Sequence, residues 1–181
     1  MNLIDPRHSA LVLVDYQQRL MPAIHGGAQA VAQAVHLADI AAVLGLPVVG
    51  TEQNPAGLGP NEPAVRERCA VTLPKMHFDA CADGLLEALA PAREVVIAGC
   101  EAHVCLLQTA LGLLDAGLKV WVVSGACASR AVANHALAMQ RLQQAGAGIV
   151  SVEMVAFEWL RSCENERFRQ ALALLKQAPP A

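Results

Sequence analysis

Short runs of consecutive apolar residues recur along the sequence, separated by longer segments in which apolar residues return every three or four positions. A run of about four to eight apolar residues is typical of a strand buried on both faces, whereas the longer spacing is typical of a helix packed on one side. The predicted strands lie at residues 10–14, 47–50, 95–98, 118–123 and 149–152, and a further apolar segment at 71–74 leads to Lys75. This alternation predicts an α/β fold with a mainly parallel sheet.

The segments between these strands carry helical patterns whose ends are marked by glycine. The predicted helices cover residues 27–44, 83–89, 131–145, 154–160 and 165–176, together with a helix that follows the turn at 99–103 and stops at Gly117. Gly45 and Gly146 likewise stand where a helix would end. We expect one doubly wound, three-layer domain over residues 1–181, with an irregular loop at 51–60 and a frayed tail at 178–181.

The composition indicates an ordered interior and a partly covered surface. Of the 181 residues, 55% are hydrophobic but only 3% are aromatic, so Ala, Val and Leu must fill the core of the domain. Only 16% are charged, which predicts that another subunit covers part of the surface. We therefore expect a homo-oligomer.

Charge and cysteine usage exclude several classes of partner. The net charge is -3 and no basic run is present, which argues against a nucleic-acid partner. No apolar run approaches membrane-spanning length and the N-terminus lacks a signal-peptide pattern, so we expect a cytoplasmic protein with no membrane partner.

The six cysteines lack paired C-x-x-C spacing and are expected to be free thiols. The first strand is not followed by G-x-G-x-x-G, so no dinucleotide cofactor is expected.

Cys105 stands at a position that favours nucleophilic chemistry. It follows the predicted strand at 95–98 and the turn at 99–103, in the first turn of the next helix. The positive end of a helix dipole favours thiolate over thiol, and the unpaired N–H groups of a first turn can bind a developing oxyanion. The alternative is that Cys105 is a small buried hydrophobic residue, as many free cysteines are.

Asp15 and Cys105 both follow strands of the predicted sheet, as do the loop after Gly50 and the loop at 124–130. The carboxyl ends of parallel strands face one crevice in which ligands bind, and Lys75 can reach the same crevice. A cation there favours the thiolate, and a carboxylate takes the thiol proton and returns it to a leaving group. Alternatively, Asp15 caps a turn and Lys75 is an ordinary surface lysine.

Several short motifs along the chain match one enzyme family. They are Leu13-Val14-Asp15, Lys75 with His77-Phe78, Gly99-Cys100-Glu101-Ala102-His103-Val104-Cys105, Thr109-Ala110, Asp115-Ala116-Gly117 and Ala126-Cys127-Ala128-Ser129-Arg130. Over residues 8–176 the sequence resembles the isochorismatase-like cysteine hydrolases, a family that includes nicotinamidases and N-carbamoyl amidohydrolases. The loop at 51–60, TEQNPAGLGP, resembles that of the isochorismatase-domain hydrolases. The resemblance implies a Rossmann-like isochorismatase fold.

The resemblance also implies a role for each matching residue. Cys105 would attack a carbonyl or nitrile-like carbon, Asp15 would act as general base and later as acid, and Lys75 would favour the thiolate and orient both partners. A non-proline cis peptide bond would fall at Cys100–Glu101, and the backbone N–H groups of Glu101 and Cys105 would form the oxyanion hole. No cofactor is implied.

This sequence differs from two groups of the family in ways that disfavour their reactions. Nicotinamidases carry an Asp-x-His metal site after the second strand, where this sequence has Glu52-Gln53-Asn54. Without imidazole ligands we expect no divalent metal, and nicotinamide is disfavoured as the substrate. True isochorismatases cleave a vinyl ether without a cysteine nucleophile, so Cys105 argues against that reaction.

Further residues are candidates for the wall of the substrate pocket. They are Gln17, Glu52, Gln53, His77, Phe78 and Cys100. For Glu52 and Gln53 a solvated loop is an equal alternative, and His77 either touches substrate or fills its turn. Cys100 is otherwise a core thiol. His103 is expected to occupy its turn rather than to act as the base.

These residues predict a metal-independent cysteine hydrolase that cleaves an amide or similar C–N bond of a small molecule through a covalent cysteine intermediate. An activated Cys105 is then expected to react with iodoacetamide well below about pH 8, faster than the other cysteines. Two alternatives remain open. One is a non-catalytic oligomer that binds a metabolite in the same crevice, and the other is a thiol redox sensor in which Cys105 pairs with Cys100 or Cys127.

Overall fold

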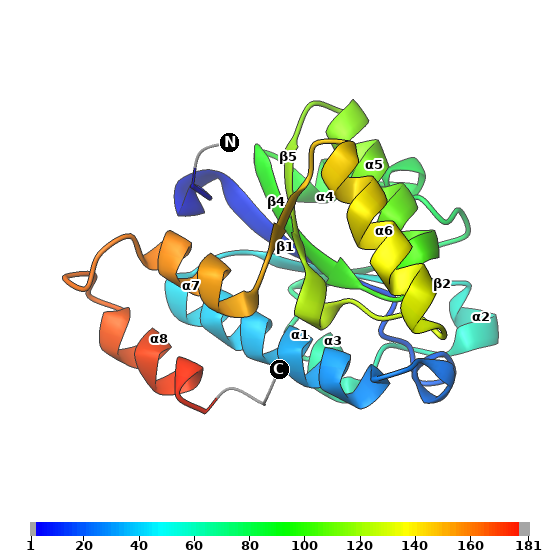
Figure 1. The fold of residues 1–181 in the computed structure, drawn as a ribbon, viewed down its shortest axis with the longest axis horizontal. Coiled ribbons are helices and arrows are strands. Elements are labelled where there is room, and N and C mark those ends of the chain that lie inside the picture. Colours follow the sequence, from blue (N-terminus) through cyan, green and yellow to red (C-terminus); the bar gives the residue numbers. More distant parts are fainter. Residues whose placement is uncertain (1–2, 178–181) are drawn as a thin grey trace.

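The computed structural model describes residues 3–177, and its centre is a six-stranded sheet with helices on both faces (Figure 1). The strand order is β3-β2-β1-β4-β5-β6, and every neighbouring pair is parallel. The strands are β1 (Ser9–Val14), β2 (Val48–Gln53), β3 (Val71–Lys75), β4 (Glu94–Gly99), β5 (Lys119–Val123) and β6 (Gly148–Val150). The predicted α/β fold with a parallel sheet is therefore confirmed.

The helices form the two outer layers. α1, α7 and α8 pack together on one face of the sheet, while α4, α5 and α6 lie on the other (Figure 1). The α-helices are α1 (Gly27–Leu44), α2 (Pro55–Leu58), α3 (Pro63–Arg66), α4 (Leu85–Leu89), α5 (Leu107–Asp115), α6 (Val132–Gln144), α7 (Val152–Leu160) and α8 (Phe168–Leu175). The shorter helical turns are η1 (Pro6–His8), η2 (Met21–Ala23), η3 (Ala80–Asp83), η4 (Ala102–Leu106) and η5 (Ser124–Ala126).

The order of the strands reverses between β1 and β4. From β1 the chain builds outward through β2 and β3, and it then returns to add β4 on the other side of β1. The pairing of Val14 with Gly99 brings the carboxyl ends of β1 and β4 side by side. In an open parallel sheet, ligands bind where the strand order reverses in this way.

The second strand is longer than the sequence predicted. Thr51 to Gln53 were expected to begin an irregular loop, but they pair in parallel with Leu73 to Lys75 of β3 and extend β2. The remainder of the expected loop at 51–60 is not wholly irregular either, because residues 55–58 form α2. The extension matters for the site, since it places residue 53 beside residue 75.

The other differences are small. α3 was not predicted, because a four-residue helix that begins at Pro63 leaves no periodic pattern. β6 ends at Val150, two residues early, because the Ser151 hydroxyl accepts a 3.2 Å hydrogen bond from the Met154 N–H and begins α7. The expected frayed tail at 178–181 lies outside the described residues.

α1 has the length and composition of a membrane-spanning helix, contrary to the expectation from the sequence. It has 18 residues with a hydropathy of 1.3, and 44% of it is buried inside the protein. Ala30, Ala34, Ala38 and Ala41 lie on one face and are buried. The helix packs on the sheet and on α7 and α8, which accounts for its apolar composition.

Gly99, at the end of β4, permits the close approach of β1. A Cβ atom at this position would lie 2.4 Å from the Val14 carbonyl oxygen and 2.5 Å from the Val14 Cβ. We therefore expect Gly99→Ala to lower the free energy of unfolding by about 1–3 kcal/mol. Urea denaturation measures this, with Gly125→Ala as control because nothing lies within 4 Å of a Cβ there. Equal stability of the two variants would contradict the argument.

Candidate active site

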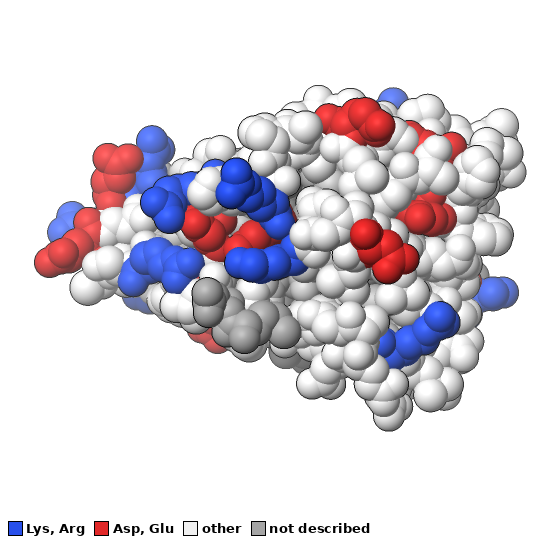
Figure 2. Space-filling model, turned by 90° about the horizontal axis from the view of Figure 1, so that it is seen from above, with Lys and Arg blue, Asp and Glu red and all other residues white. Residues whose placement is uncertain are grey.

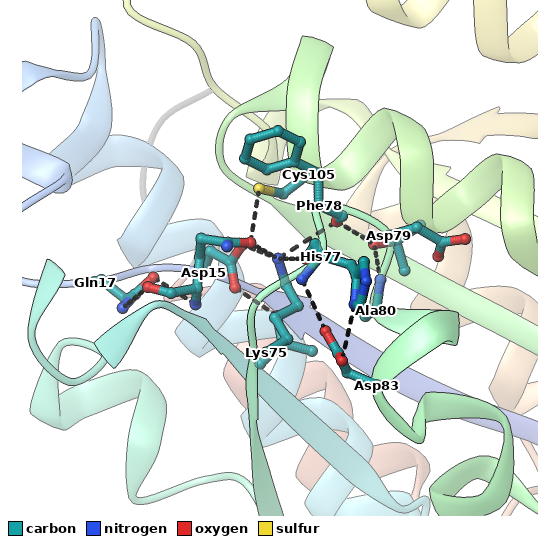
Figure 3. A network of polar contacts seen from close by, with 12 residues as sticks. Asp15, Gln17, Lys75, His77, Phe78, Asp79, Ala80, Asp83 and Cys105 are labelled. Carbon is teal, nitrogen blue, oxygen red and sulfur yellow. Dashed lines mark hydrogen bonds and ion pairs between the residues drawn. The ribbon is translucent and has the colours of Figure 1, made fainter. Parts of the chain in front are cut away.

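The structure brings the acid, the ammonium and the thiol together at the carboxyl edge of the sheet (Figure 3). The Lys75 Nζ atom lies 2.8 Å from Asp15 Oδ2, and both side chains are 0% exposed. Gln53 Oε1 lies 2.6 Å from the same Nζ atom and 3.8 Å from the Cys105 Sγ atom. The four side chains therefore form one continuous polar network, although they come from four separate segments of the chain.

Asp15 is held in an unusual backbone conformation immediately after β1. Its φ is 54°, in the left-handed region that aspartate enters more readily than most residues. Its Oδ1 atom accepts a 2.7 Å hydrogen bond from the Thr51 hydroxyl. Its Oδ2 atom faces the Lys75 ammonium but accepts no directed hydrogen bond from residues 3–177. One carboxylate oxygen is thus fixed, while the other keeps a lone pair available for a proton.

Lys75 is surrounded by oxygen atoms. Besides Asp15 and Gln53, its ammonium contacts the backbone carbonyl oxygens of His77, at 3.3 Å, and Phe78, at 3.4 Å. A buried ammonium needs such compensation because it has left water. The alternative that Lys75 is an ordinary surface lysine is therefore wrong.

Cys105 lies in η4, a π-helical turn, rather than in the first turn of a regular α-helix as predicted. The N–H groups of Val104 and Leu106 both donate to the Glu101 carbonyl oxygen, at 3.0 and 3.3 Å. Cys105 is only 7% exposed. Burial raises the pKa of its thiol to about 12, and the Asp15 charge adds to this rise while Lys75 opposes it. Burial therefore opposes the thiolate that the position at a helix start was expected to favour.

The raised pKa changes the expected labelling of Cys105. Because the pKa of Cys105 is raised to about 12, its iodoacetamide reaction should be slow near neutral pH and should still be accelerating at pH above about 9. The exposed Cys163 should react first. Peptide mass spectrometry across a pH series measures both rates. Faster labelling of Cys105 than of Cys163 near neutral pH would show that the thiol is activated at rest.

The backbone before Cys105 offers a hydrogen-bond donor. The Cys100–Glu101 peptide bond is cis, as the resemblance implied. The Glu101 N–H belongs to this bond, and the next N–H along the chain, that of Ala102, donates a 2.8 Å hydrogen bond to the Ala128 carbonyl oxygen. The Glu101 carboxylate accepts hydrogen bonds from the Arg130 N–H, at 2.9 Å, and from Arg130 Nε, at 3.0 Å. Burial acts to raise the pKa of Glu101, but these hydrogen bonds outweigh burial and lower it.

The three residues Gln17, Glu52 and Gln53 have different environments. The Gln17 amide is used entirely inside the protein, because Nε2 donates to the Gln53 and Gly59 carbonyl oxygens and Oε1 accepts from the Gln53 N–H. Glu52 points to the opposite side of β2, where it accepts a 2.9 Å hydrogen bond from the Asn61 N–H. Neither is free to line the substrate pocket as predicted, whereas Gln53 contacts Lys75 and Cys105.

The other three pocket candidates, His77, Cys100 and Phe78, differ in their exposure and contacts. The His77 ring is paired with Asp83 at 3.0 Å and its side chain is 68% exposed, so it fills its turn. Cys100 is 0% exposed and is a core thiol rather than a pocket residue. Phe78 is half-exposed, with its ring on the same side as the Cys105 sulfur (Figure 3), and it remains a pocket candidate.

His103 occupies its turn, as expected. Its Nδ1 atom lies 3.0 Å from Ser129 Oγ and its Nε2 atom lies 3.3 Å from Asn134 Nδ2. Both ring nitrogens are therefore engaged away from Cys105. All six cysteines are free thiols.

Sequence reasoning missed Thr51, whose hydroxyl holds Asp15. The signal was present in the strand pattern, because residues 51 and 53 share one face of a strand and residue 52 faces the other. The Pro- and Gly-rich sequence after Gly50 predicts a loop at Thr51 instead.

Among residues 3–177 no group of three or more His, Cys, Asp or Glu side chains is arranged to hold a metal ion.

Comparison with known proteins places this geometry in a family. The isochorismatase domain model matches residues 9–154. Isochorismatase domain-containing protein 2 of Rattus norvegicus is 32% identical, with 98% of this chain and 85% of the relative covered. The human protein of the same name is 33% identical, with 97% and 86% covered.

Solved structures agree with this match. The structure described as MAR1 ribonuclease from Caenorhabditis elegans superposes with a TM-score of 0.94 at 32% identity and covers 99% of this chain and 95% of that one. The YcaC gene product from Escherichia coli, described as an octameric hydrolase of unknown specificity, superposes with a TM-score of 0.89 at 24% identity, with 98% and 91% covered. The match of the domain model and the identity to the rat and human proteins show that this chain belongs to the isochorismatase domain family of hydrolases.

Proposed function

We propose that this protein is a metal-independent cysteine hydrolase that cleaves an amide or similar C–N bond of a small molecule. The observation that carries the proposal is the buried network of Asp15, Lys75 and Cys105, in which one carboxylate oxygen is left open for a proton. Removing two charges from water costs free energy, so a buried ion pair contributes little net stability to the fold. Its position beside a thiol, where the strand order reverses, therefore supports a catalytic role.

The reaction begins from a neutral thiol. As Cys105 Sγ bonds to the acyl carbon, the thiol proton passes to Asp15 Oδ2 and the carbonyl electrons move to the oxygen. Lys75, 2.8 Å from Asp15 Oδ2, keeps the carboxylate charged until that transfer. Collapse of the intermediate breaks the C–N bond, and the leaving nitrogen takes the proton from Asp15. Asp15 then accepts a proton from the water that attacks the thioester. As the C–S bond breaks, the sulfur takes this proton from Asp15, and the thiol and the carboxylate are both restored.

Backbone donors next to the nucleophile support this route. The Glu101 N–H and the Cys105 N–H, which the family resemblance assigns to the oxyanion hole, would hold the oxyanion of the tetrahedral intermediate. The Glu101 carboxylate is turned to Arg130 and so keeps its charge away from that oxyanion.

Phosphodiester cleavage, which the name of the C. elegans relative suggests for that protein, has less support here. Holding a polynucleotide requires cations that can pair with phosphates, and the Lys75 ammonium is already neutralised by Asp15. On the face seen in Figure 2, Lys and Arg gather around Asp and Glu side chains and do not form a basic stripe. These observations favour a small acyl substrate over a polyanion.

A substrate screen tests the proposal. Purified protein is incubated with a panel of small amides, N-carbamoyl compounds and nitriles, with the Cys105→Ala protein as control, and product formation is followed by mass spectrometry. Acrylamide belongs in the panel as a probe of the thiol, because the YcaC structure from Pseudomonas aeruginosa contains covalent acrylamide. Hydrolysis by the parent chain alone supports the proposal. No hydrolysis and no covalent adduct at Cys105 would overturn it.

We also propose that the protein is a homo-oligomer. Large apolar side chains are exposed on the single chain, among them Met76, Phe78, Val132, Leu137, Met154 and Phe157. Much of the face in Figure 2 carries no charge, and the E. coli YcaC protein is described as octameric. Light scattering at micromolar protein tests this, and a monomeric mass would reject it.

A further inference from the structure

The Gln53 side chain lies between the Lys75 ammonium and the Cys105 thiol. Its Oε1 atom accepts a 2.6 Å hydrogen bond from the Lys75 ammonium and lies 3.8 Å from Cys105 Sγ, within reach of a weak S–H hydrogen bond (Figure 3). Gln53 is 8% exposed, so solvent competes little for this oxygen. One carbonyl oxygen is thus shared by the ammonium and the thiol.

The orientation of the Gln53 amide is fixed by its other contacts. Its Nε2 atom donates a 2.9 Å hydrogen bond to the Met76 carbonyl oxygen. A flipped amide would set its oxygen against that carbonyl and its N–H groups against the ammonium, so only one orientation satisfies all the groups. The Gln17 side chain clamps the Gln53 backbone N–H and carbonyl oxygen at 2.9 and 3.0 Å.

We propose that Gln53 is a positioning residue that keeps the Cys105 thiol protonated at rest and sets the pH at which it becomes a nucleophile. The oxygen end of the Gln53 amide dipole faces the sulfur and opposes negative charge there. The same oxygen accepts a hydrogen bond from the Lys75 ammonium and so weakens the stabilisation that this ammonium gives to a thiolate. The inference rests on the proposed function for its catalytic meaning.

Two charged side chains act on the thiol from other elements. Asp15, after β1, disfavours the thiolate, and Lys75, at the end of β3, favours it. Gln53 is the neutral group between them on β2, whose register pairs it directly with Lys75. The net effect of Asp15 and Lys75 on the Cys105 thiol therefore depends on where Gln53 holds the Lys75 ammonium.

Two nearly isosteric substitutions should change this balance in opposite directions. Gln53→Met removes the oxygen at similar length, so Cys105 should react with iodoacetamide about tenfold faster near neutral pH. Gln53→Glu places a second carboxylate beside the thiol, so the reaction should be about tenfold slower. The rate is measured by mass spectrometry of the Cys105 peptide over a pH series.

Glu52→Gln is the matched control, because the adjacent side chain points away to Asn61. It should leave the rate and the pH profile of Cys105 labelling unchanged. Circular dichroism and thermal unfolding establish that each variant is folded, and if Gln53→Glu does not fold, the direction of the change in Gln53→Met decides. A slower or unchanged rate in Gln53→Met would overturn the inference, as would a change of both variants in the same direction.

The labelling rate needs no substrate, so this test is separate from that of the proposed function. Opposite changes in labelling with no hydrolysis of any panel compound would overturn the hydrolase proposal alone. Hydrolysis dependent on Cys105, with no effect of Gln53 on labelling, would overturn the role of Gln53 alone.

Discussion

The Cys105→Ala variant is expected to fold like the parent chain and to lose about six orders of magnitude in turnover, which is the scale seen when a covalent nucleophile is removed. The loss is large because no other group can form the acyl intermediate. Among the other cysteines, Cys100 and Cys127 are also buried, but neither takes part in the network of Asp15, Lys75 and Gln53. The free energy of unfolding should change little, since alanine differs from cysteine by a single atom.

Steady-state kinetics on the best substrate of the panel measures this loss. Cys127→Ala is the matched control, because it removes an equally buried thiol elsewhere at the same edge of the sheet. It should retain most of the activity. A Cys105→Ala protein that keeps its activity would exclude covalent catalysis by this residue.

Asp15→Asn and Lys75→Met should each reduce both activity and stability. Each leaves a buried charge without its partner, and breaking such a pair costs about 3–5 kcal/mol of unfolding free energy. Asp15→Asn also removes the proton acceptor, which should lower kcat by about 10²- to 10⁴-fold. Asparagine accepts the left-handed backbone that residue 15 requires, so the substitution changes charge without changing φ.

The double variant separates stability from catalysis. With both charges removed, it should be more stable than either single variant and yet remain inactive, because neither acid nor ammonium is restored. Urea denaturation and steady-state kinetics on all three proteins complete the cycle. Lys176→Met, at an exposed lysine that makes no ion pair among the described residues, serves as control. Additive losses in stability would show that the pair is not coupled.

The sequence was sufficient for the fold and for the meeting of Asp15, Lys75 and Cys105 at one edge of the sheet. Apolar runs and glycine stops identify strands and helices because a doubly wound sheet buries its strands on both faces. The rule that carboxyl ends of parallel strands share one edge then brings Asp15 and Cys105 together. The motif at residues 99–105 was among those that indicated the isochorismatase-like family.

The electrostatic state of the site could not be obtained in this way. Whether a helix start favours a thiolate depends on how deeply the thiol is buried, and the pKa of Cys105 is raised because it is nearly covered. The roles of Thr51 and Gln53 depend on residues 51–53 of β2, where the Pro- and Gly-rich sequence predicts a loop instead. The internal contacts of Gln17 cannot be predicted from the sequence pattern, because its partners lie far away in sequence, at residues 53 and 59.

The contacts of Gln17 have a consequence for protein engineering. One amide ties the end of β2 to the Gly59 carbonyl oxygen, so residues 54–58 form an insert whose two ends are anchored by the same side chain. Grafting a different sequence between these anchors should therefore leave the two ends of the segment, and with them the position of residue 53, unchanged.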